Sequence, residues 1–125
     1  MQNQNINFKN SLKDRCYRFS LDLIRMIDTL PRDRSSSVIS NQLLRSGTSI
    51  GANLIEAQGS SSRIEFKRYN EISLKSSNET KYWLGLLKDS GKGDEALVSK
   101  LITEVEELSS MLASGILKLK GLNKF

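Results

Sequence analysis

Hydrophobic and polar positions alternate with helical spacing along most of the chain, and the breaks in this pattern divide it into four segments. Apolar residues recur three, four or seven positions apart, as on one face of an α-helix. We expect helices at about 11–28, 36–58, 62–90 and 94–119, all within one domain that spans 1–125. Short connections between long helices favour antiparallel neighbours. The pattern therefore predicts an all-α fold, an antiparallel up-down-up-down four-helix bundle.

Residues that end or cap helices support these boundaries. Pro31 lies in the first connection, and Gly59 is placed to follow the second helix as its C′ residue. Ser62 and Glu65 fit a capping box at the start of the third helix, and Asp94 is placed to cap the fourth. The helix limits thus depend on local chemistry as well as on periodicity.

Each helix carries an apolar stripe that we expect to face the core. The first helix contributes Leu12, Cys16, Phe19, Leu23 and Ile27. The second contributes Ile39, Leu43, Gly47, Ile50 and Leu54. The third contributes Phe66, Tyr69, Ile72, Ser76, Trp83, Leu86 and Leu87. The fourth contributes Leu97, Leu101, Val105, Leu108, Leu112 and Leu119.

The second helix has an unusual pattern, because it is apolar on two flanks. Its second flank consists of Leu44, Gly51 and Ile55. Between the flanks runs a narrow polar stripe of Arg45, Ser49, Asn53 and Glu56. Two interpretations stay open: a central helix of a small core, or an oligomer interface in which these polar residues pair with one another. On the second interpretation, the small residues Gly47, Gly51 and Ala52 would admit the backbone of another chain.

Composition excludes most catalytic classes. The chain has no His, which removes His-dependent triads and most zinc or di-iron sites. Its single Cys, Cys16, forms no intrachain disulfide, lies on an apolar face and lacks a His base, so we expect a core residue in a reducing compartment. No cofactor, no metal and no enzymatic activity are expected. The polar start and the absence of an apolar run of about 20 residues predict a soluble, cytoplasmic protein without membrane contact.

The net charge of +5, from 19 basic and 14 acidic residues, gives a modest preference for anionic partners. Basic residues gather on the first and third helices. The candidate nucleic-acid-binding residues are Arg15, Arg18, Arg25, Arg63, Lys67, Arg68, Lys75, Lys81 and Lys88. Acidic residues are interleaved with them, so a solvated face with intrahelical ion pairs is the competing interpretation.

The run from Gln42 to Ala57 resembles the signature of the 23S ribosomal RNA intervening-sequence protein family. The similarity continues through Ser62, Glu65-Phe66 and the stretch from Glu79 to Leu84, and it departs from the family pattern at Lys75-Ser-Ser-Asn78. This resemblance implies a four-helix bundle that assembles as a five-fold ring. A distant relative is the accessory protein of diversity-generating retroelements, which binds nucleic acid and a reverse transcriptase.

Carried over by position, the matching polar residues are Arg45, Ser49, Asn53, Glu56 and Glu79, for which the resemblance implies no catalytic role. We call these five residues the polar seam and expect them at the interface between copies. The sequence thus favours a non-catalytic homo-oligomer that binds structured RNA or a nucleic-acid–protein complex. The alternative is a protein adaptor without nucleic-acid binding, for which Tyr17, Tyr69, Tyr82 and Trp83 would supply aromatic anchors.

Overall fold

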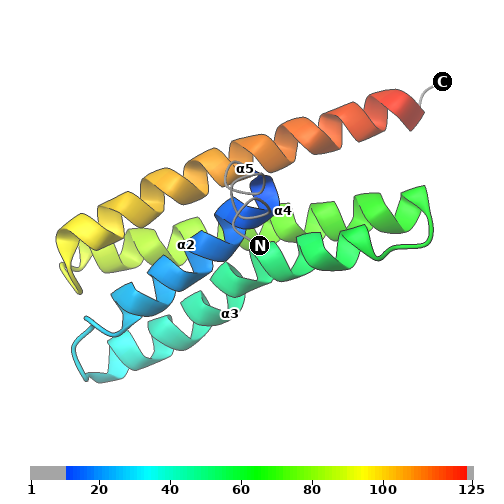
Figure 1. Cartoon of the computed structure of the whole chain (residues 1–125). Helices are drawn as coiled ribbons and strands as arrows, with labels where there is room; N and C mark the ends of the chain where they lie inside the picture. The colour runs from blue at the N-terminus through cyan, green and yellow to red at the C-terminus, as the bar shows by residue number, and fades with distance from the viewer. Residues whose placement is uncertain (1–10, 124–125) are drawn as a thin grey trace, which may run out of the picture.

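Four antiparallel helices form a bundle in which each helix packs on the next and the last packs back on the first (Figure 1). The structure is a computed structural model that describes residues 11–123, with side chains to residue 121. The helices are α2 (Leu12–Ile27), α3 (Arg34–Gln58), α4 (Arg63–Asp89) and α5 (Glu95–Asn123). The predicted all-α four-helix bundle is confirmed. The predicted domain spans 1–125, and its residues 1–10 and 124–125 lie outside the described residues.

Side-chain caps set the beginnings of the helices, within two residues of the predicted positions. Ser11, Asp33 and Ser62 each accept a hydrogen bond from the backbone N–H three residues later, and Asp94 accepts one from Leu97 at 3.1 Å. At the other end of α3, Gly59 has φ −88°, so the left-handed glycine cap expected there does not form. At its far end, α5 extends four residues beyond its predicted limit.

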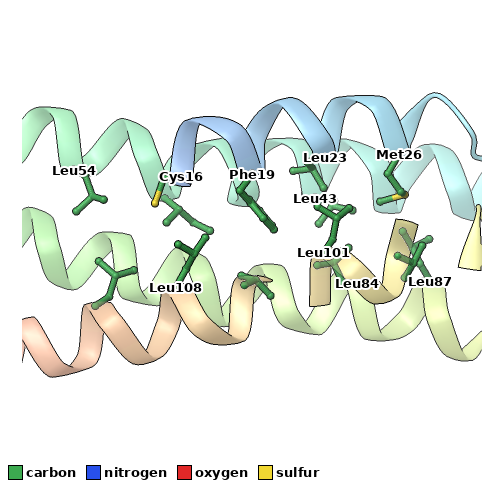
Figure 2. Close-up of a cluster of buried hydrophobic side chains, with 14 residues drawn as sticks. Cys16, Phe19, Leu23, Met26, Leu43, Leu54, Leu84, Leu87, Leu101 and Leu108 are labelled. Carbon is green, nitrogen blue, oxygen red and sulfur yellow. The ribbon is translucent and has the colours of Figure 1, made fainter. Parts of the chain in front are cut away.

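The core is a layer of aliphatic and aromatic side chains from all four helices (Figure 2). Phe19 and Leu23 of α2 are fully buried. They belong to the same core cluster as Leu43 of α3, Leu84 of α4 and Leu108 of α5. Cys16 belongs to this layer, and burial raises its pKa to about 12. The thiolate is therefore disfavoured, which agrees with the expected core role of Cys16.

The apolar stripe predicted for α4 was wrong for most of its length. Phe66, Ile72 and Leu86 are each more than one-third exposed. The buried residues of α4 are the small hydroxyl residues Ser73, Ser77 and Thr80, followed by Leu84 and Leu87, of which Leu87 was predicted. The prediction failed because it counted large apolar side chains and gave no weight to hydroxyls that find partners inside the bundle.

Those hydroxyls pair across the helices. Ser73 donates to the carbonyl oxygen of Ile50 at 2.8 Å, and the Thr80 hydroxyl lies 3.0 Å from the Ser46 hydroxyl. The Ser109 hydroxyl of α5 lies 2.7 Å from that of Ser77. Small side chains let α3 and α4 approach closely, and these two helices share the most extensive contact in the bundle.

Two glycines of α3, Gly47 and Gly51, allow α2 of the same chain to pack closely against α3. A Cβ atom on Gly51 would lie 3.2 Å from the Cβ of Cys16, and one on Gly47 would clash with Leu23 Cδ2. Both neighbours belong to α2. The expectation that these glycines admit the backbone of another chain is therefore wrong, since α2 already occupies that side of α3.

This packing predicts opposite effects for two Gly→Ala substitutions. Gly47→Ala should destabilise the protein by about 1–3 kcal/mol, because the new methyl group overpacks the buried Leu23. Gly85→Ala meets nothing within 4 Å and should stabilise α4 by up to about 1 kcal/mol through helix propensity. Urea unfolding of both variants measures the difference. Equal signs would show that α2 does not pack against Gly47 as described.

Candidate functional site

Two members of the polar seam join α3 to α4. Arg45 forms an ion pair with Glu79, and its Nη2 also donates to Gln42 Oε1 at 3.0 Å. Glu79 Oε2 in turn accepts a hydrogen bond from Trp83 Nε1 at 2.9 Å. The side chains of Arg45 and Glu79 are 59% and 35% exposed. The result is a linked surface cluster rather than a buried charge network within the single chain.

The other three members of the seam do not join this cluster. Asn53 Nδ2 donates to the carbonyl oxygen and hydroxyl of Ser49, at 2.8 and 2.9 Å, so these two residues bond locally along α3. Glu56 is exposed and has no ion-pair partner among residues 11–121. Its carboxylate is therefore available to a partner outside the chain. The role of the seam between copies stays a prediction.

Ion pairs already engage the basic residues predicted on α2. Arg15 Nη2 contacts Glu104 at 2.7 Å and Glu107 at 3.0 Å, and the hydrogen bonds that it donates to these two carboxylates raise the pKa of Arg15. Arg18 pairs with Asp14 at 3.0 Å.

Arg25 lies 3.1 Å from Asp22, which also lies 3.7 Å from Lys100 of α5. The positive charge of α2 is thus largely compensated, as the competing interpretation of a solvated face expected.

The basic residues of α4 differ from those of α2. The helix carries six candidate cations, and among the described side chains none of them forms an ion pair with a carboxylate. They are Arg63, Lys67, Arg68, Lys75, Lys81 and Lys88. The main contacts of both α2 and α4 are with α3 and α5, so α2 and α4 lie diagonally across the bundle. The two basic faces therefore do not merge into one surface on a single chain.

A second regular stripe runs along the outside of α4. Its members alternate at intervals of four and three residues, which places them on one side of the helix. They are Arg68, Ile72, Lys75, Glu79, Tyr82 and Leu86. All except the partly exposed Glu79 are exposed, and we call this set the outer stripe. The apolar stripe predicted for this helix included Ile72 and Leu86. The regular spacing of four and three residues that joins them to Arg68, Lys75 and Tyr82 was the feature of the sequence that indicates a second, exposed face.

An apolar groove lies on the other side of α3, between α3 and α2. It has a volume of about 470 Å³, with Tyr17 and Ser20 on one wall and Gly51 and Ile55 on the other. Tyr17 is 66% exposed and Ile55 is 53% exposed. We call this the α2–α3 groove. The second apolar flank predicted for α3 therefore stays largely uncovered.

Among the described residues, no group of three or more His, Cys, Asp and Glu side chains is arranged to hold a metal ion. No helix within the same residues is both long and apolar enough to cross a membrane.

Comparison with known proteins shows to which family this bundle belongs. Residues 9–114 match the family model described as 23S rRNA-intervening sequence protein. The chain belongs to this family. The matched range of the 23S rRNA-intervening sequence protein family includes α2, α3, α4 and most of α5, and thus both the polar seam and the outer stripe.

A solved structure supports the assignment. It is the crystal structure of a protein with unknown function from the S23 ribosomal protein family of Bacteroides thetaiotaomicron VPI-5482. The two sequences are 35% identical, the TM-score is 0.77, and the match covers 84% of this chain and 97% of that chain. No curated protein matches the sequence. Membership in the family therefore establishes the fold and leaves the activity open.

The exposure of Arg45 predicts a small effect on stability. Arg45→Ala should lower the free energy of unfolding by less than about 1 kcal/mol, because exposed ion pairs contribute on that scale. Arg25→Ala, which removes another exposed pair, serves as the matched control in urea unfolding. A loss of about 3–5 kcal/mol, typical of a broken buried pair, would show that contacts outside the single chain bury Arg45.

Proposed function

We propose that this protein is a non-catalytic, self-assembling binding protein of the cytoplasm that holds structured RNA, or a complex of nucleic acid and protein, on α4. The observation that carries this proposal is the contrast between two helices. The basic residues of α2 are paired with carboxylates, whereas the six on α4 have no such partner among the described residues. Unpaired cations are the groups that contact phosphates and displace their counterions.

Two further observations favour RNA as the ligand. The chain carries a net charge of +5, so an anionic partner is attracted at long range as well as at contact. The matching family is described by an intervening sequence of 23S rRNA, which makes RNA the first ligand to test. Catalysis finds no support, since the one thiol is buried and the chain has no His.

Assembly is the second part of the proposal. The α2–α3 groove exposes Tyr17 and Ile55, and Leu44 of the same flank of α3 is 40% exposed. Apolar surface of this kind favours burial against another protein surface. Contact of this groove with a different surface of an identical chain is head-to-tail, and it closes into a ring when the rotation permits, here proposed as five copies.

Repeated copies would also strengthen RNA binding. Each chain offers only a few phosphate contacts, and linked binding sites raise the overall affinity without new contacts. The competing function is a protein adaptor that uses the same α2–α3 groove for a different partner. Exposure of Tyr17 in the groove favours it as the second candidate, because aromatic residues anchor protein interfaces.

The assembly is tested by measuring mass in solution. Light scattering should give about five times the 14.1 kDa mass of the chain. Ile55→Glu should dissociate the assembly, since it places a charge in the apolar groove. The control is Val38→Glu, at a similarly exposed position of α3 outside the groove lining. A mass of one chain at every concentration would reject self-assembly.

RNA binding is tested by charge reversal on α4. The double variant Arg68→Glu, Lys75→Glu should bind a folded RNA at least about tenfold more weakly in moderate salt, and its salt dependence should be shallower by roughly one unit per lost phosphate contact. The melting temperature should hardly change, because both residues are exposed and form no ion pair among the described residues.

The matched control reverses two cations that share Asp22. Arg25→Glu with Lys100→Glu removes the same formal charge, but both side chains already pair with that carboxylate. Equal affinities and salt slopes for the wild type and the α4 variant would reject α4 as the binding surface. If neither protein binds RNA at low salt, the adaptor function is favoured.

A further inference from the structure

Tyr82 is the exposed aromatic residue of the outer stripe. Its side chain is 61% exposed, although it lies on a helix whose other face is packed in the core. The ring meets Trp83 edge to face, with the ring centroids 5.1 Å apart and the planes inclined at 73°. One face of an exposed phenol ring next to a second aromatic ring is a surface on which another flat group can stack.

Hydrogen bonds fix the neighbour of this ring. Trp83 Nε1 donates to Glu79 Oε2 at 2.9 Å, and Glu79 is held by its ion pair with Arg45. The polar cluster therefore orients the indole ring against which Tyr82 rests. An exposed aromatic ring that is already oriented loses less conformational entropy on binding than a freely rotating one. This gives the Arg45–Glu79 pair a positioning role that its small contribution to stability would not reveal.

The outer stripe places cations at regular distances from Tyr82. Lys75 precedes it by one heptad and Arg68 by two, so along a helix they lie about 10 and 21 Å away. Neither has a carboxylate partner among the described residues. An aromatic ring in line with unpaired cations matches the alternation of bases and phosphates along a single nucleic-acid strand. A duplex presents the phosphates alone, because its bases are already stacked inside.

We infer that Tyr82 is a stacking platform for an unpaired base of RNA, whose flanking phosphates contact Lys75 and Arg68. This inference depends on the proposed function and makes it more specific: the bound part of a structured RNA is a loop, bulge or end. Unpaired bases supply the flat apolar face that Tyr82 accepts, and any base does so, because each has a π-face. Binding is therefore selective for unpaired nucleotides and tolerant of their sequence.

Tyr17 provides the internal comparison. It is as exposed as Tyr82, at 66%. It lines the apolar α2–α3 groove beside Asp14, however, and the Arg18 side chain next to it already pairs with that carboxylate. An exposed Tyr without unpaired cations beside it does not fit a nucleic-acid strand. The two tyrosines therefore separate general aromatic exposure from the arrangement on the outer stripe.

The test measures binding of fluorescently labelled oligouridylate and of a duplex RNA of equal length by the full chain. Tyr82→Ala should weaken oligouridylate binding about five- to 100-fold, the range for loss of one stacked base, and leave duplex binding unchanged. Tyr82→Phe should retain the wild-type affinity, because stacking needs the ring and not the hydroxyl. Tyr17→Ala changes the α2–α3 groove and leaves the outer stripe intact, so it should shift the affinities for both RNAs by the same factor. The single Trp of the chain, Trp83, should change its emission when oligouridylate binds to the wild type, and not in Tyr82→Ala.

The remaining outcomes separate the inference from the function on which it depends. If Arg68→Glu with Lys75→Glu weakens binding and Tyr82→Ala does not, the stacking role is overturned and α4 stays the RNA surface. Equal losses for both RNAs in Tyr82→Ala also overturn stacking. If the wild type binds neither RNA at low salt, the proposed function fails as a whole. A Tyr82→Ala variant that changes the mass of the assembly and not RNA binding would show that Tyr82 contacts another protein chain.

Discussion

The contact between α3 and α4 is lined by hydroxyl groups, and the arrangement of the bundle depends on it. Ser73 bonds to the backbone of Ile50, and Thr80 meets Ser46 inside the core. Burying a hydroxyl without a partner costs free energy, so these pairs favour one way for the two helices to face each other. Because the side chains are small, the helices also come close. Gly47 and Gly51 do the same on the α2 side of α3. Small residues therefore bring α3 close to both of its neighbours, α4 and α2.

This close packing determines which large side chains stay outside. With Ser73, Ser77 and Thr80 turned inward, the opposite side of α4 must carry Ile72, Tyr82 and Leu86 toward solvent. The exposed apolar positions thus follow from the geometry of the core. Exposed apolar positions carry a risk of aggregation, and clusters of them mark surfaces for partners. The outer stripe and the α2–α3 groove are the two surfaces of this kind that support binding and assembly.

Much of the fold was predictable because helix periodicity and caps are local properties. The limits of α2, α3 and α4 fell within two residues, and the buried apolar positions of α5 from Leu101 to Leu112 were those predicted. The face of α4 was not predictable by counting apolar residues, since Ser73 and Thr80 become compatible with the core only through partners on other helices. The candidate cations were predictable in part. Arg18 and Arg25 pair within α2, as helical spacing allows, whereas Arg15 pairs with carboxylates that α5 brings near, and sequence spacing does not contain that information.

The unequal lengths of the helices have a consequence for how the chain folds. α2 has 16 residues, whereas α3, α4 and α5 have 25, 27 and 29. The three long helices form two consecutive hairpins whose contacts are local in sequence, and local contacts form early. The contact of α2 with α3 is less extensive than the contacts among the three long helices. Closing α2 onto α5 joins segments far apart in the sequence, through Arg15 with Glu104 and Asp22 with Lys100. We therefore expect α2 to dock last and open first, so its amide protons should exchange with solvent faster than those of the helices it covers.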